Sequence, residues 1–113
     1  MTISHFKNAL EQLLPAATPV AVPLGQPLAM IRSLGVERDD GVEAGIWECS
    51  PGRWRRQVVQ QEFCHFIAGT CTFTPDGGEA IEIRAGDALV FPANTKGIWD
   101  IRETVRKTFL LIG

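Results

Sequence analysis

The sequence predicts a single all-β domain of the sandwich or jelly-roll class. From residue 45 onward, short runs rich in β-branched and aromatic residues alternate with turn signals roughly every ten residues. The long amphipathic helices that a parallel sheet requires are missing from this part of the chain. Its 113 residues, 45% of them hydrophobic, are enough for one domain whose core needs neither disulfides nor a structural metal.

The first 27 residues predict a short helix followed by an extended arm. The apolar residues that would form one helical face recur at spacings of three and four: Ile3, Phe6, Leu10, Leu13 and Leu14. Pro15 ends this helix, because proline cannot continue the hydrogen-bond ladder. Prolines at 15, 19, 23 and 27 then restrict the chain to an edge strand or an arm. We expect that arm to lie along the barrel or along a neighbouring subunit.

The strands predicted beyond the arm are short and separated by clear turns. They span residues 45–49, 54–59, 62–67, 71–74, 80–83, 88–91, 98–101 and 108–112. The sequence Pro75-Asp76-Gly77-Gly78 is the strongest hairpin signal among the turns.

Charge and cysteine content exclude several classes of protein. The net charge of −2 gives no overall attraction to nucleic acid or anionic membrane, and strand alternation splits Arg53 and Arg55 from Arg56. The three cysteines include no C-x-x-C pair, so they predict neither a disulfide framework nor a zinc knuckle. No apolar run is long enough to span a membrane, and the first residues lack a signal-peptide core. We expect a cytoplasmic protein without nucleic-acid or membrane partners.

Two stretches resemble the conserved motifs of the cupin superfamily. Glu62 and Gly69 are separated by six residues, and Gly86 and Pro92 by five. The phrases at 45–54, 62–65, 97–99 and 104–107 are similar to the small single-domain cupins grouped with (S)-ureidoglycine aminohydrolase.

The resemblance implies a cupin double-stranded β-helix, that is, a jelly-roll barrel. Residues 1–113 would form one cupin domain, with the helix and proline-rich arm at 1–27 and the conserved barrel at 40–113.

The metal-binding histidines of that superfamily are replaced in this chain. Metal-binding cupins carry His-x-His a few residues before the glutamate. Counting back from Glu62 places those positions on Arg55 and Gln57, or on Arg56 and Val58 if the loop is one residue shorter.

The second motif also departs from the pattern of metal-binding cupins. The glycine after its proline becomes Asn94, and the histidine position becomes Gly97. Glu62 with Gln57 alone is a poor transition-metal site, and a nearby arginine repels a cation. We therefore expect no cofactor, with a divalent metal at Gln57 and Glu62 as the alternative.

The resemblance and strand alternation together place five candidate residues around a ligand pocket. They are Arg55, Gln57, Glu62, Cys64 and Trp99. Glu62 is either a general base or acceptor for a substrate, or a structural partner of Arg55 or Lys107. Cys64 faces the same interior, as a small buried hydrophobe or a nucleophile. Trp99 forms a pocket wall or, like Trp47 and Trp54, packs in the core or a dimer interface.

Three classes of function stay open. The first is a metal-independent cupin that binds a small molecule. The second is an enzyme acting on small nitrogen-containing or sugar-derived metabolites, resembling ureidoglycine aminohydrolase or the epimerase cupins. The third is a structural or regulatory protein without chemistry of its own. In each case we expect a homodimer, because pairing would cover an exposed sheet edge.

Overall fold

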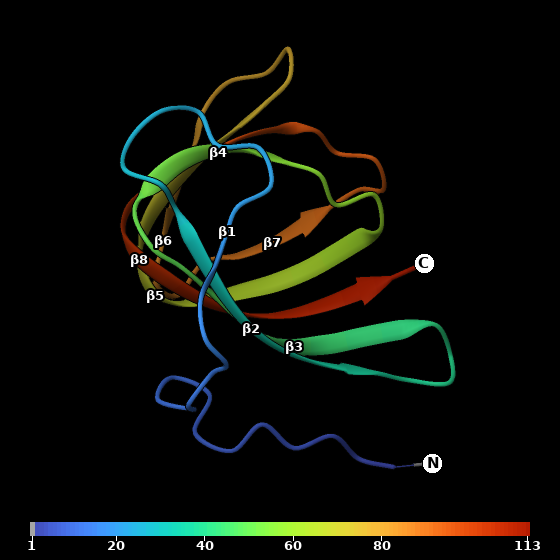
Figure 1. Cartoon of the computed structure of the whole chain (residues 1–113). Helices are drawn as coiled ribbons and strands as arrows, with labels where there is room; N and C mark the ends of the chain where they lie inside the picture. The colour runs from blue at the N-terminus through green and yellow to red at the C-terminus, as the bar shows by residue number, and fades with distance from the viewer. Residues whose placement is uncertain (1) are drawn as a thin grey trace.

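A computed structural model describes residues 2–113 as an eight-stranded antiparallel sheet curved into a β-barrel-like shape (Figure 1). The strands are β1 (Thr18–Pro19), β2 (Met30–Glu37), β3 (Val42–Cys49), β4 (Gly52–Arg56), β5 (Gln61–Pro75), β6 (Ile81–Arg84), β7 (Ala88–Phe91) and β8 (Gly97–Ile112). Neighbours follow the order β1-β2-β3-β8-β5-β6, while β4 pairs with β8 and β7 with β5. The all-β prediction is therefore confirmed.

Two long strands, β5 and β8, shape the barrel. The first part of β5 pairs with β7 and the end of β8, and its second part pairs with β6 and the start of β8. The register shifts between Phe66 and Cys71, where β5 bends. Gly69 lies in this bend at φ +82°, and a Cβ there would stand 2.2 Å from the Thr104 carbonyl oxygen. The bend thus requires glycine, and it joins two strands that the sequence predicts as separate.

The core is an aromatic cluster centred on Trp99, which is 1% exposed. Its ring centroid lies 4.8–6.3 Å from those of five neighbours: Trp47, Trp54, Phe66, Phe73 and Phe91. Such tilted pairs add about 0.5–1.5 kcal/mol each beyond the area they bury. The three cysteines fill the space beside them and are fully buried. The core therefore fills the middle of the barrel.

The predicted N-terminal helix is wrong. Residues 7–11 form turns between extended stretches, and Asn8 takes a left-handed φ of +50°, which interrupts helical geometry. The periodic apolar face is not buried, because Ile3 is 90% and Leu13 86% exposed, and only Leu14 of the five lies in the core. A helix this short is marginal alone and forms only where packing covers one face, which is not the case here.

Two arginines of the sheet hold this segment by its carbonyl groups instead. Arg106 on β8 donates to the carbonyl oxygens of residues 9 and 12 at 2.9 and 2.8 Å. Arg32 on β2 donates to those of residues 14 and 15 at 2.6 and 3.0 Å. Glu48 on β3 lies between them, 2.9 Å from Arg106 Nη2 and 3.6 Å from Arg32 Nη1. We call these three residues the arginine clamp.

The proline-rich arm lies along its own barrel, the first of the two placements expected for it. Thr18 pairs with Ile31 at the edge of β2. Further along, the Leu24 amide donates to the Arg53 carbonyl at 2.8 Å, and the Arg55 amide donates to the Val22 carbonyl at 3.0 Å. The arm thereby covers the open edge of β4. Across residues 2–113 there is no helix of the length and apolarity that crossing a membrane requires.

Candidate functional site

Three charged side chains meet inside the barrel. Glu62 on β5 is 3% exposed, and its two oxygens are both engaged. Oε1 accepts a hydrogen bond from Arg56 Nη2 at 2.8 Å, and Oε2 lies 2.8 Å from Lys107 Nζ. Arg56 ends β4 and Lys107 lies on β8, so three separate strands supply the cluster. We call Arg56, Glu62 and Lys107 the charge triad.

The triad carries two positive charges against one negative charge. Burial alone would raise the pKa of Glu62, but the nearby Lys107 ammonium and Arg56 guanidinium outweigh it and hold that pKa below its ordinary value. The carboxylate is therefore ionised at neutral pH. With both oxygens paired and a low proton affinity, Glu62 is suited to positioning cations rather than to accepting a proton as a general base.

Lys107 lies in an aromatic box. Its Nζ is 4.4 Å from the Trp47 ring centroid, 5.3 Å from Trp99 and 5.7 Å from Phe66. Such contacts stabilise an ammonium by about 0.5–2 kcal/mol each. An ammonium has three N–H donors, and Glu62 is its one polar partner within residues 2–113. Lys107 therefore retains hydrogen-bonding capacity for a further acceptor.

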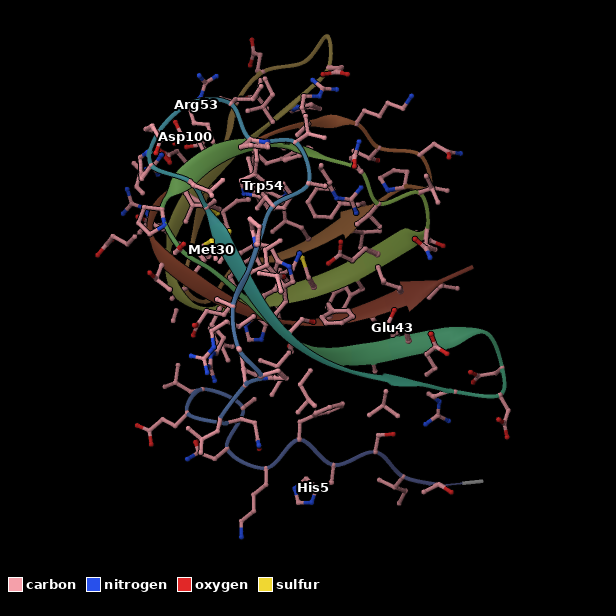
Figure 2. The ribbon with its side chains drawn as sticks, in the orientation of Figure 1. His5, Met30, Glu43, Arg53, Trp54 and Asp100 are labelled. Atoms are coloured by element: carbon pink, nitrogen blue, oxygen red, sulfur yellow. The ribbon has the colours of Figure 1, made fainter. Side chains whose placement is uncertain are left out.

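A cavity of about 170 Å³ lies against Glu62 and Lys107 of the triad. We call it the mouth pocket. Its polar lining is Ser33, Glu43, Glu62 and Lys107, and its apolar wall includes Trp47 and Phe109. Glu43 lies near the outer end of β3 (Figure 2). The mouth pocket thus combines the Lys107–Glu62 ion pair at its floor, an aromatic wall and the carboxylate of Glu43 at its rim.

A second cavity, of about 360 Å³, lies between the arm, the end of β4 and the loop after β7. We call it the basic pocket. Its polar lining is Arg55, Arg56, Gln57, Asn94 and Lys96. Arg56 connects the two cavities indirectly: it lines the basic pocket, and its Nη2 donates to Glu62, which lines the mouth pocket.

The structure divides the five predicted pocket residues among three places. Glu62 lines the mouth pocket, whereas Arg55 and Gln57 line the basic pocket. Cys64 and Trp99, at 0% and 1% exposed, lie in the core. The Cys64 side chain points to the same interior as Glu62, as strand alternation predicts, and burial raises the pKa of its thiol to about 11. A thiol of that pKa is a packing group rather than a nucleophile.

The partners of Glu62 differ from the sequence expectation in one respect. Lys107 does pair with it, but Arg55 faces outward and binds both oxygens of Asp76, at 2.9 and 2.7 Å. The hydrogen bond from Arg55 lowers the pKa of that carboxyl. Arg56 takes the interior position, which corresponds to the shorter of the two loop counts. The sequence predicts that count only as an alternative and does not indicate Arg56 as a partner of Glu62.

Fold and site together define a cupin-fold protein. The chain belongs to the family of EutQ-like cupin domains, whose sequence profile matches residues 36–109. A search among functionally curated proteins finds no significant match.

Solved structures support the fold. A protein of unknown function of the DUF861 family from Pseudomonas syringae is 21% identical with a TM-score of 0.78; the match covers 89% of this chain but only 45% of that one. The EutQ protein of Clostridium difficile is 14% identical, TM-score 0.65, over 74% of this chain and 63% of its own. A DUF861 family protein of Thermotoga maritima is 28% identical with a TM-score of 0.57, and the match covers 59% of this chain and 76% of that one. The chain thus spans less than two thirds of the length of the Pseudomonas syringae and Clostridium difficile proteins.

The residues at the cupin metal position do not fit a metal ion. Two cations already occupy the oxygens of Glu62, and a guanidinium and an isopropyl group, from Arg56 and Val58, stand at the counted His-x-His positions. A side chain at Gly97 has no room, since its Cβ would lie 2.4 Å from the Thr74 carbonyl oxygen. Nowhere within residues 2–113 do three His, Cys, Asp or Glu side chains gather as a metal site.

Proposed function

We propose that this protein binds a small carboxylate-bearing, nitrogen-containing metabolite in the mouth pocket without a metal ion. The observation that carries the proposal is Lys107, a buried ammonium that faces a cavity with donors to spare. A ligand carboxylate would accept those N–H groups.

The charge of the triad supports an anionic ligand. Within the triad, one carboxylate between two buried cations leaves one positive charge without a counter-charge. A buried charge is costly unless it is paired. A ligand carboxylate therefore gains more binding free energy from Lys107 than it would from a solvated lysine. Trp47 and Phe109 line the cavity with apolar surface, and a less polar surrounding strengthens the interaction further.

The size and rim of the pocket indicate the rest of the ligand. A cavity of 170 Å³ equals the liquid volume of roughly six waters, since each occupies about 30 Å³, which suits a molecule the size of an amino acid. Glu43 and Ser33 can accept hydrogen bonds from amino or ureido N–H groups. The resemblance to the ureidoglycine aminohydrolase group supports the same nitrogen-containing class. A cytoplasmic homodimer without nucleic-acid or membrane partners completes the proposal, and light scattering tests the dimer.

Calorimetric titration of chelator-treated protein with N-carbamoylglycine tests the proposal. We expect binding that Lys107→Met weakens at least tenfold, because one charge-assisted hydrogen bond is lost, while Lys96→Met outside the mouth pocket leaves it unchanged. The amide of the same compound, which lacks the carboxylate, should bind weakly. Equal binding to Lys107→Met and wild type refutes the assignment, as does binding that requires an added metal.

A further inference from the structure

We propose that the basic pocket is a second ligand site, which takes the phosphate group of a small phosphomonoester. It lies outside the mouth pocket and depends on different side chains. Arg55 and Arg56 come from the end of β4, and Lys96 from the loop that precedes β8.

The lining of this cavity is cationic and carries no carboxylate among the residues that the structure describes. Lys96 forms no salt bridge with any residue from 2 to 113. The side-chain amides of Gln57 and Asn94 add neutral hydrogen-bond donors. Arg56 is 2% exposed, and the carbonyls of Val58 and Thr95 hold its Nη1 at 3.2 and 2.9 Å. A guanidinium fixed in this way is pre-organised to face an anion.

Asp76 shows that the rim of the basic pocket already binds an oxyanion. Its carboxylate accepts two hydrogen bonds from Arg55. Its main-chain amide donates to the Lys96 carbonyl at 2.9 Å, which keeps the β5–β6 turn beside that lysine. Asp76 thus acts as an internal anion, and an incoming phosphate would compete with it for Arg55.

The number of cations and the shape of the cavity favour a phosphate ester over a simple carboxylate. Arg55, once it exchanges Asp76 for a ligand, and Lys96 can bind a tetrahedral dianion from two elements beside the buried Arg56, and a guanidinium fork matches phosphate oxygens in pairs. The volume of 360 Å³ leaves room beyond the phosphate, and Val22, Val58 and Val59 supply an apolar wall for carbon atoms. The ester group would lie against these valines.

The test is an NMR and calorimetric titration of the full chain with glycerol phosphate and, separately, inorganic phosphate, at ionic strength matched with sodium chloride. We expect the ester to shift the amide signals of residues 55–59 and 94–96 and to bind more tightly than inorganic phosphate. Arg55→Gln and Lys96→Gln should each weaken the ester roughly tenfold. Asp76→Asn should strengthen it, because the internal competitor for Arg55 is removed.

Two controls make the test decisive. Arg53→Gln removes the same charge from the same strand. Arg53 lies beside Asp100 (Figure 2) and does not line the cavity, so ester binding should stay unchanged. Lys107→Met should likewise leave it unchanged, which separates this inference from the mouth pocket. Equal weakening by Arg53→Gln and Arg55→Gln would show mere charge attraction and overturn the proposal. Three other results would also overturn the proposal. They are loss of ester binding in Lys107→Met, equal affinity for the ester and for inorganic phosphate, and amide shifts no larger than those that sodium chloride causes.

Discussion

Replacing Glu62 by glutamine removes the one negative charge of the triad and leaves two buried cations. Arg56 and Lys107, whose side chains are 1% and 6% exposed, would then repel each other without a carboxylate between them. Removing one partner of a buried pair costs about 3–5 kcal/mol, and here a single carboxylate serves two partners. We expect Glu62→Gln to lower the free energy of unfolding by at least this amount, out of a total of about 5–15 kcal/mol for a domain.

Lys107→Met gives the contrasting expectation. It removes the uncompensated positive charge and leaves a one-to-one pair between Arg56 and Glu62. Methionine is similar in volume to lysine, and its thioether can fill the aromatic box beside Trp47. A volume-conserving change of this kind costs less than about 1.5 kcal/mol.

Urea denaturation followed by tryptophan fluorescence measures both variants. With a slope of about 1.5 kcal/mol per molar urea, a loss of about 4 kcal/mol moves the midpoint down by roughly 2.5 M. Lys107→Met should move it by less than about 1 M, and Lys7→Met gives the baseline for an exposed lysine. If Lys107→Met destabilises the protein as much as Glu62→Gln, the triad is a balanced network and the argument from excess charge is wrong.

Two further predictions concern titration. The pKa of Glu62 is lower in the folded state, so its contribution to stability is complete above its ordinary pKa of 4.5 and is lost as the pH falls through the lower folded value. The difference between the urea midpoints of wild type and Glu62→Gln should therefore stay constant from pH 5.5 to 7. It should narrow below pH 4.5. Burial raises the pKa values of Cys49, Cys64 and Cys71 to about 12, 11 and 12, so a thiol reagent at pH 8 should label none of them in the native protein and all three in guanidinium. Rapid labelling of a native thiol would contradict the burial described here.

The sequence predicts the barrel well because its signals are local. Strand alternation depends on neighbouring residues, and it correctly places Glu62 and Cys64 on one face of β5. The sequence predicts no element at Met30–Glu37, where Gly35 weakens the strand pattern.

The N-terminal segment and the triad were harder to predict because both depend on distant residues. The spacing from Ile3 to Leu14 fits a helix, yet the carbonyls of that segment are bound by Arg106, more than ninety positions away. For the triad, one residue of loop length decides whether Arg55 or Arg56 points inward. That length is fixed only when β4 pairs with β8, placing Arg56 opposite Gly97.

The arginine clamp has a consequence for how freely the N-terminal segment can change. Arg106 and Arg32 bind main-chain oxygens, and every amino acid supplies one; Pro15, which has no N–H, serves as an acceptor as well as Leu14 does. The path of the segment is therefore largely independent of its side chains, most of which lie in solvent. Substitutions at residues 2–13 can therefore change the surface of the protein in this region while the barrel beneath keeps its geometry.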